Sequence, residues 1–346
     1  MEGVEIDGSQ GEGGGQILRI AVAFAAIKRV PVRVVKIREG REVPGLKRQH
    51  LSALRILSSV FGGRLEGDEE GSMKVTFVPG GQNVTSLSVD MGTAASITLV
   101  LQAVIPAVAL SGSELRVGLT GGTDVPWSPT FDYFSRVALE GYRAIGIEAM
   151  ASASRRGYYP KGGGQVSSEI RKCAGVTPIG LADPPSTATA TIVSRCGSLP
   201  RDVAARQARA ATELLGASGI GVAKTEVMEE RSNSPGTSVL VYSVDGGRIM
   251  GTDAIGERGK PAEDVGAEAA AKFVSTLRSG ASIDANLSDM LLPLLSLASA
   301  PSRVRVPEVT PHLESGMFLA EQFTSCRWKA EKQGSSALVT VRPAGT

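Results

Sequence analysis

Cysteine is scarce in this sequence of 346 residues. The three cysteines, Cys173, Cys196 and Cys326, are an odd number and show none of the short spacings that ligate zinc. They support neither a disulfide framework nor a cysteine-based metal site. A reducing compartment fits this pattern best, and we therefore expect a cytoplasmic protein.

A targeting segment and a membrane-spanning run are also missing. The N-terminus has no basic region before an apolar run and no cleavage signal. The longest apolar segment, residues 94–112, contains Thr98, Gln102 and Pro106 and is too short to span a membrane. We interpret it as a buried helix of a soluble protein that exceeds one domain, and we expect no membrane partner.

Three common catalytic loops are absent. The glycine-rich stretch GSQGEGGGQ, residues 8–16, lacks the G-x-G-x-x-G order, and the only Gly-Lys pair, Gly259-Lys260, precedes proline, so it is not a Walker A loop. No serine occupies a G-x-S-x-G elbow. The sequence therefore argues against a P-loop enzyme and against an ordinary serine hydrolase.

Net charge is small, at +2, but one segment is locally basic. Only Glu39 and Glu42 oppose its six cations, which are Arg33, Lys36, Arg38, Arg41, Lys47 and Arg48. Such a patch can attract phosphates, although a solvated surface loop has the same composition. Taken alone, the pattern favours the surface loop.

One order of elements recurs three times along the chain. A helix leads to a strand, a turn with glycine or proline, a second helix and two further strands, in residues 16–80, 94–170 and 286–343. We expect an α+β domain of three pseudo-symmetric repeats, each with two helices and a four-stranded sheet.

The third repeat is interrupted. Residues 183–279 follow a different order of strand, helix, strand, hairpin and helix, and their acidic and basic side chains nearly balance. We expect an inserted α/β domain at 183–279 and a catalytic domain made of 1–182 and 280–346. The charge balance of the insert therefore gives no indication of a basic surface that would bind nucleic acid.

The chain has two histidines. His50 shares a helical stripe with Leu54, Leu57 and Phe61, which predicts a packed structural histidine. His312, in VPEVTPHLESG, falls between a strand and a helix start, where unpaired N–H groups favour an anion. Ordinary capping would look the same, and position alone does not decide between the two interpretations.

Five segments, in this order, resemble the RNA 3′-terminal phosphate cyclases. They are GSQGEGGGQILR, IREGREVPGLKRQHL, GGTDVPWSPTFDY, RRGYYPKGGGQ and EVTPHL. The resemblance extends to about Phe323 and includes the interruption by an insert. It implies that a histidine takes AMP from ATP and releases pyrophosphate. The AMP then passes to the 3′-phosphate of RNA, and the neighbouring 2′-hydroxyl closes a 2′,3′-cyclic phosphate as AMP leaves.

The resemblance also implies roles for single residues. The nucleophile corresponds to His312, and the family's metal-binding glutamate corresponds to Glu12, which would hold Mg²⁺ or Mn²⁺ against phosphates. The groups expected to bind phosphates of ATP or RNA are Arg19, Arg38, Arg41 and Gln49. The nucleotide is expected to contact Gln102, Pro126, Asn286, Leu287, Ser288, Asp289 and Met290.

Structural interpretations exist beside several of these roles. Arg19 could extend from a helix to solvent, Gln102 could be a core amide, and Asp289 could be a first-turn helix acid. The sequence also departs from the family: Asn286 replaces a common tyrosine, and Met290 replaces a glutamine. After His312 the usual Thr-Asn is replaced by Ser315-Gly316.

Two other functions remain as alternatives. A eukaryotic branch of the family acts in ribosome assembly and lacks the nucleophilic histidine, whereas His312 is present here. Enolpyruvyl transferases have related repeats, but no motif for their chemistry is visible. The expected partners are ATP and RNA with a 3′-phosphate end, and a homo-oligomer is possible.

Overall fold

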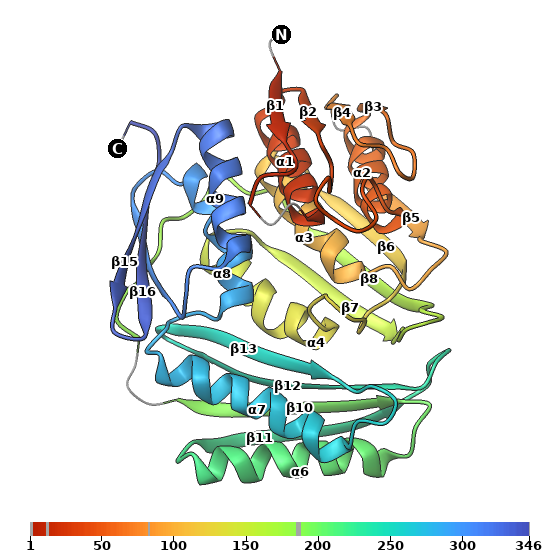
Figure 1. Ribbon diagram of the computed structural model, residues 1–346, viewed down its shortest axis with the longest axis vertical. Coiled ribbons are helices and arrows are strands. Elements are labelled where there is room, and N and C mark those ends of the chain that lie inside the picture. The colour runs from red at the N-terminus through yellow and green to blue at the C-terminus, as the bar shows by residue number, and fades with distance from the viewer. Residues whose placement is uncertain (1–2, 12–13, 82–83, 185–187, 346) are drawn as a thin grey trace.

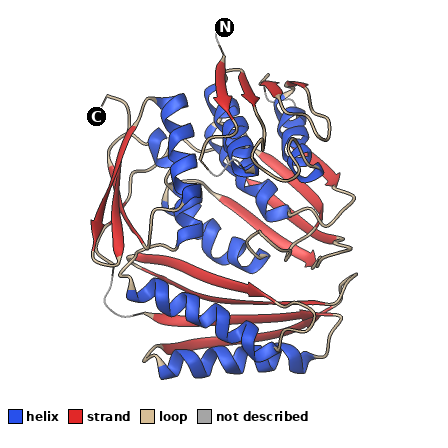
Figure 2. Ribbon diagram, in the orientation of Figure 1, coloured by secondary structure: helices blue, strands red, loops and turns tan. Residues whose placement is uncertain are grey.

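The computed structural model describes residues 3–11, 14–81, 84–184 and 188–345, and only the backbone of Gln49. Within these residues the strands form four-stranded mixed sheets, each associated with helices (Figure 1). Figure 2 shows sheets and helices packed as alternating layers. The predicted α+β fold is confirmed.

The first sheet contains strands β1 (Val4–Asp7), β2 (Val32–Val35), β3 (Arg64–Glu66) and β4 (Val75–Val78) in the order β1-β2-β4-β3. Strand β1 runs parallel to β2, and the other pairs are antiparallel. Helices α1 (Gly15–Lys28) and α2 (Arg48–Phe61) complete this unit.

The second sheet repeats this strand order as β5-β6-β8-β7. Its strands are β5 (Ser86–Asp90), β6 (Leu115–Gly121), β7 (Ala149–Arg155) and β8 (Gly164–Ile170). Its helices are α3 (Ile97–Leu110), α4 (Phe131–Tyr133) and α5 (Leu139–Ala144), the last two joined by a π-helical turn. Most of α3 is buried, so the prediction of a buried helix is confirmed.

The third sheet has the order β15-β16-β14-β9 and contains β9 (Gly180–Leu181), β14 (Ser302–Val306), β15 (Arg327–Gln333) and β16 (Ser336–Arg342). Helices α8 (Ala285–Leu291) and α9 (Pro311–Thr324) complete this third unit. The same element order thus occurs in three units, whereas their pseudo-symmetry stays a prediction. The sequence pattern did not identify the leading strands β1, β5 and β9, which have four, five and two residues.

The segment between β9 and α8 forms a further sheet with the order β11-β10-β12-β13. It comprises β10 (Thr189–Gly197), α6 (Arg201–Ala217), β11 (Gly221–Glu230), β12 (Gly236–Asp245), β13 (Arg248–Ile255) and α7 (Ala262–Arg278). A separate apolar cluster that includes Ile192, Leu215 and Phe273 lies between its sheet and its helices. Its independence as a domain stays a prediction.

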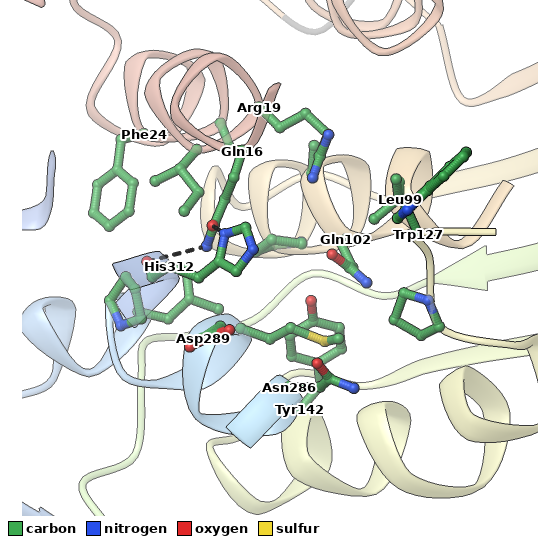
Figure 3. Close-up of a pocket in the computed structure, with 18 residues that line it drawn as sticks. Gln16, Arg19, Phe24, Leu99, Gln102, Trp127, Tyr142, Asn286, Asp289 and His312 are labelled. Carbon is green, nitrogen blue, oxygen red and sulfur yellow. Dashed lines mark hydrogen bonds between the residues drawn. The ribbon is translucent and has the colours of Figure 1, made fainter. Parts of the chain in front are cut away.

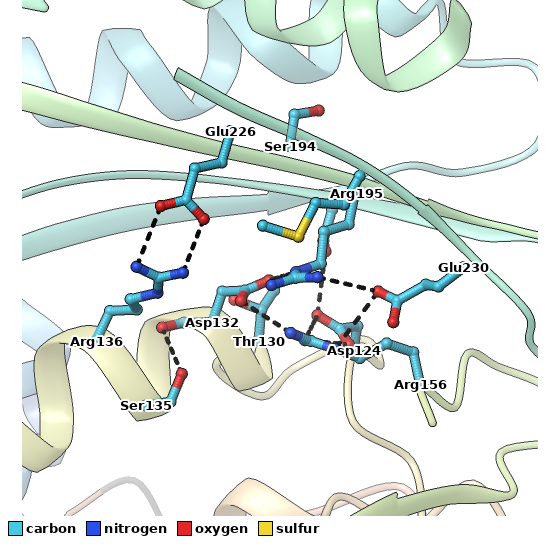
Figure 4. A network of polar contacts seen from close by, with 12 residues as sticks. Asp124, Thr130, Asp132, Ser135, Arg136, Arg156, Ser194, Arg195, Glu226 and Glu230 are labelled. Atoms are coloured by element: carbon cyan, nitrogen blue, oxygen red, sulfur yellow. Dashed lines mark hydrogen bonds and ion pairs between the residues drawn. The ribbon is translucent and has the colours of Figure 1, made fainter. Parts of the chain in front are cut away.

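A buried network of charges joins this inserted unit to the second unit (Figure 4). Arg156 contacts Asp124 at 3.2 Å and Asp132 at 2.8 Å, and Arg195 of β10 donates to Asp132 at 2.7 Å. Both arginines also face Glu230 of β11. Shared carboxylates therefore fix the insert against the loop that begins at Asp124.

The charges of this network shift the pKa values of its acids in opposite directions. Burial favours the neutral form of Asp132, but the charges and hydrogen bonds of Arg156 and Arg195 outweigh it and lower the pKa of Asp132. At Glu230 the effect of burial is larger than the opposing effect of the charges of Arg156 and Arg195, and the pKa of Glu230 is raised. The ionised form of Asp132 is therefore the one that the interface stabilises.

None of the described helices is long and apolar enough to cross a membrane.

Candidate active site

A pocket lies where helices α1, α3, α8 and α9 meet the loop that precedes α4 (Figure 3). It contains about 840 Å³ of empty space, which includes space open to solvent. The polar side chains that line it are Gln16, Arg19, Gln102, Asn286, Asp289 and His312. Five of these six were predicted as site residues from the sequence.

His312 lies in the first turn of α9, as the sequence predicted. Thr310 caps this helix by accepting the N–H of Leu313 at 2.9 Å, and Pro311 occupies the first turn. The Thr310 hydroxyl also donates to Asp289 of α8 at 2.6 Å. Asp289 therefore fixes the cap of the helix that carries His312, in addition to lining the pocket.

Gln16 of α1 contacts both the main chain and the ring of His312. Its Nε2 donates to the main-chain oxygen of His312 at 3.3 Å, and its Oε1 faces Nδ1 of the same residue. An amide oxygen only accepts hydrogen bonds, so this contact favours the neutral tautomer with the proton on Nδ1 and the lone pair on Nε2. Figure 3 shows the imidazole between Gln16 and Gln102.

Gln102, in the middle of the apolar helix α3, has a polar atom without a protein partner. Its Nε2 is buried and has no hydrogen bond within the part of the chain that the structure describes. An unpaired buried amide is unfavourable by about 1–3 kcal/mol. Because Gln102 lines the pocket, a ligand acceptor there would remove this cost, which favours a binding role over a satisfied core amide.

Helix α8 contributes one face to the pocket. Asn286, Asp289 and Met290 line the pocket, whereas Leu287 and Ser288 are fully buried on the opposite side. Asp284 caps the helix by accepting the N–H of Leu287 at 3.0 Å. Leu287 and Ser288 are therefore core residues in this structure rather than pocket-lining ones.

Comparisons with known proteins identify the family of the chain. The family model of RNA 3′-terminal phosphate cyclase matches residues 10–330. The chain belongs to the RNA 3′-terminal phosphate cyclase family. The prediction of this family, and of an enzyme rather than a non-catalytic factor, is confirmed.

Individual archaeal cyclases resemble the chain over almost its whole length. A protein named RNA 3′-terminal phosphate cyclase from Pyrococcus furiosus is 41% identical over 92% of this chain and 92% of its own. Proteins of the same name from Pyrobaculum neutrophilum and Korarchaeum cryptofilum are each 37% identical over at least 99% of both chains.

Besides Leu287 and Ser288, three described residues expected from the cyclase resemblance do not line this pocket. Arg38 donates to the main-chain oxygens of Val43 and Gly45 at 2.7 and 3.2 Å, and burial together with the nearby Arg41 lowers its pKa. Arg41 is exposed on the same loop. Pro126 lines an adjoining groove, and Pro129 takes its place at the pocket.

Two predicted residues cannot be placed. Glu12 lies outside the described residues, as does the side chain of Gln49. Among the described residues no group of three or more His, Cys, Asp or Glu side chains could hold a metal ion. The magnesium site therefore stays a prediction that rests on Glu12.

The glycine-rich loop of the cyclase family packs against α9 and α2. A Cβ on Gly11, whose φ is +57°, would lie 2.1 Å from the Ser315 hydroxyl oxygen. A Cβ on Gly15 would lie 2.3 Å from Nε2 of His50. Glycine at position 11 therefore leaves room for the Ser315 side chain, and glycine at position 15 leaves room for the His50 ring.

Sequence reasoning missed Gln16, Trp127 and Tyr142 as pocket residues. Gln16 and Trp127 both lie inside segments that carried the cyclase resemblance. Tyr142 is buried in α5, and only the packing of α5 beside α8 brings it to the pocket.

His50 is a structural histidine, as predicted. It is 2% exposed, and its Nδ1 accepts the main-chain N–H of Lys47 at 3.1 Å. Burial, followed by the charges of Arg19, Arg38 and Lys47, lowers its pKa from 6.5 to about 3.

The neutral state of His50 predicts an acid-dependent loss of stability. Between pH 6.5 and about 3 the unfolded chain binds a proton at this site that the folded chain does not, so stability falls as pH decreases. The contribution of His50 is fully present above pH 6.5 and decreases by up to about 1.4 kcal/mol per pH unit below it. Urea unfolding of wild type and His50→Gln at several pH values measures this slope, which we expect to be smaller in the variant. Parallel slopes would show that His50 does not titrate in this way.

Proposed function

We propose that this chain uses ATP to convert the 3′-phosphate end of RNA into a 2′,3′-cyclic phosphate through AMP bound to His312. The observation that carries the proposal is the imidazole at the pocket wall, whose Nδ1 faces Gln16 Oε1. This contact favours the tautomer that leaves Nε2 as the nucleophile. The names of the archaeal relatives support the overall reaction.

In the first step Nε2 of His312 attacks the α-phosphorus of ATP. The bond between this phosphorus and the bridging oxygen breaks, and pyrophosphate leaves. The ring becomes positively charged, and Gln16 Oε1 accepts the Nδ1–H of this cation. Arg19, which lines the same pocket, is placed to attract the phosphates.

In the second step an oxygen of the RNA 3′-phosphate attacks the α-phosphorus, and the bond to Nε2 breaks. In the third step the 2′-hydroxyl gives its proton to solvent and attacks the phosphorus of the RNA 3′-phosphate. The bond from this phosphorus to the oxygen that bridges it to AMP breaks, and AMP leaves. Phosphorus is attacked at each step and no redox change occurs. His312 is regenerated with its proton still on Nδ1.

The remaining pocket residues suit a nucleotide. Gln102 offers an unpaired amide donor, and Asn286 adds a second amide on α8. Asn286 and Met290 replace the family's tyrosine and glutamine, so nucleotide selectivity is expected to rest more on Gln102. Glu12 is the residue we propose to hold Mg²⁺, which would neutralise phosphate charge.

The experiment that tests the proposal is covalent labelling. The protein is incubated with Mg²⁺ and ATP labelled at the α-phosphate and then denatured. We expect acid-labile, alkali-stable label on the chain, because a phosphoramidate has this reactivity. Addition of RNA with a 3′-phosphate should discharge the label and give cyclic ends. A folded protein that binds ATP and never takes up label would refute the proposed mechanism.

Gln16 is expected to act as a positioning residue in the first step. Gln16→Leu removes the acceptor for Nδ1–H, and we expect AMP loading to slow roughly 10- to 100-fold. Gln16→Glu restores an acceptor and should raise the pKa of His312, so its loading rate should recover most at higher pH. The pH profile of loading is the measurement. Equal, pH-independent losses in both variants would indicate a packing role alone.

A further inference from the structure

A second hollow adjoins the pocket that His312 lines. We call this second hollow the aromatic groove. It shares Leu99 and Trp127 with the pocket, and Figure 3 shows these two side chains together at the edge of the pocket. Its walls come from five loops and from the start of α2 and α3, and include Val43, Lys47, Arg48, Glu70, Pro126, Trp127 and Tyr159.

Large exposed hydrophobic side chains are concentrated in this groove. Trp127 is 98% exposed, Tyr159 is 67% exposed and Val43 is 58% exposed. These are three of the six such side chains among the described residues. Trp127 also has a φ of +60°, which is strained for an aromatic residue. Exposed apolar groups and a strained backbone at one place indicate a binding function.

The groove also contains cations. Lys47 and Arg48 are exposed on its wall, and Arg48 is partly neutralised by Glu70 at 3.1 Å. Arg38 supports the same wall through its hydrogen bond to the main-chain oxygen of Val43. The positive charges of Arg19, in the pocket, and of Lys47, in the groove, both lower the pKa of the buried His50. Positive charge is therefore gathered where the two hollows meet.

We infer that the aromatic groove binds the single-stranded RNA that leads to the 3′-phosphate. Trp127 and Tyr159 would stack on bases, and Lys47 and Arg48 would face the backbone phosphates. Exposed aromatic rings beside cations are typical of single-strand sites. The inference rests on the proposed function, because a strand whose terminal phosphate reaches His312 must leave the pocket through an adjoining hollow.

The first test separates AMP loading from its discharge. Loading is measured without RNA, and the loaded protein is then mixed with increasing concentrations of an RNA oligonucleotide that ends in a 3′-phosphate. Tyr159→Ala should raise the concentration for half-maximal discharge about 5- to 100-fold. Met150→Ala is the matched control, because Met150 is 58% exposed on β7 and lies outside the groove.

The outcomes distinguish a failure of the proposed function from a failure of the groove inference. If wild type does not load AMP, the proposed function fails. If loading and discharge are normal in wild type, and Tyr159→Ala behaves like Met150→Ala, the groove inference alone is overturned. The wild type could instead self-associate as its concentration rises, and Tyr159→Ala could abolish this association without changing RNA discharge. That result would show that this face is an interface between two copies, and it would also overturn the groove inference.

A second test reports on stacking directly. The chain has two tryptophans, so Trp328→Phe leaves Trp127 as the only indole reporter. Adding the RNA oligonucleotide should quench its fluorescence, and Lys47→Gln should lower the salt slope of binding by about 0.7 for one lost phosphate contact. RNA that binds without changing the Trp127 signal or the Lys47 salt slope would contradict the groove.

Discussion

Replacing His312 by alanine is expected to abolish AMP loading and to lower cyclisation by roughly 10³-fold or more. The reason is that Nε2 of His312 is the proposed nucleophile, and no other described residue lining the pocket is a histidine. Loading is measured as label retained on the denatured chain after incubation with ATP labelled at the α-phosphate. Binding of ATP without chemistry should persist, because Gln102 and Arg19 remain.

The sequence offers a matched control for this experiment. Its only other histidine is His50, which is buried and kept neutral. His50→Gln should retain label as long as it folds. If His312→Ala still takes up acid-labile label, or if His50→Gln loses it while folded, the assignment of the nucleophile is wrong. A folded wild type without label would favour a non-catalytic, RNA-binding role.

Replacing Arg156 by methionine is expected to lower the free energy of unfolding by about 3–5 kcal/mol. The change would leave Asp124 and Asp132 buried without the guanidinium that contacts both. It would also remove the cation that lies 4.9 Å from the centre of the Phe131 ring. Urea unfolding followed by circular dichroism measures the effect.

An exposed arginine provides the comparison for Arg156. Arg206 of α6 pairs with Asp202 and Glu263 near the surface, and Arg206→Met should change stability by less than about 1 kcal/mol. If Arg156→Met does not fold, Arg156→Met combined with Asp132→Asn should recover part of the loss by removing one buried charge. Equal stability of the two single variants would show that the buried network contributes no more than a surface pair.

The predicted roles of the site residues came from the resemblance to the cyclase family, and local signals added the positions of a few of them. The segment VPEVTPHLESG put His312 between a strand and a helix start, and Gln102 was visible as a polar side chain inside an apolar segment. These signals act within a few residues. The α+β class was likewise predictable from helices and strands in a repeated order.

Other parts of the site depend on contacts between distant segments. Gln16 and His312 are 296 residues apart, and nothing in the local pattern around Gln16 indicates a bond to an imidazole. Pro126 and Pro129 are equivalent by composition, and only the fold shows which of them lines the pocket. Arg38 was predicted as a phosphate ligand, whereas in this structure its hydrogen bonds support a loop. Cytoplasmic location, oligomeric state and metal preference stay predictions.

The position of the insert in the sequence also sets the order in which the units of the fold can form during synthesis. Gly180 and Leu181 pair with Arg303 and Val304, so the third sheet closes only after the ribosome has made the whole inserted unit. The first two sheets and the insert can form earlier from nearly contiguous segments. Helix α9, with His312 at its start, emerges among the last elements. A nascent chain that stalls before this point contains a complete inserted unit but lacks His312, the proposed nucleophile, and we expect that it cannot be charged with AMP.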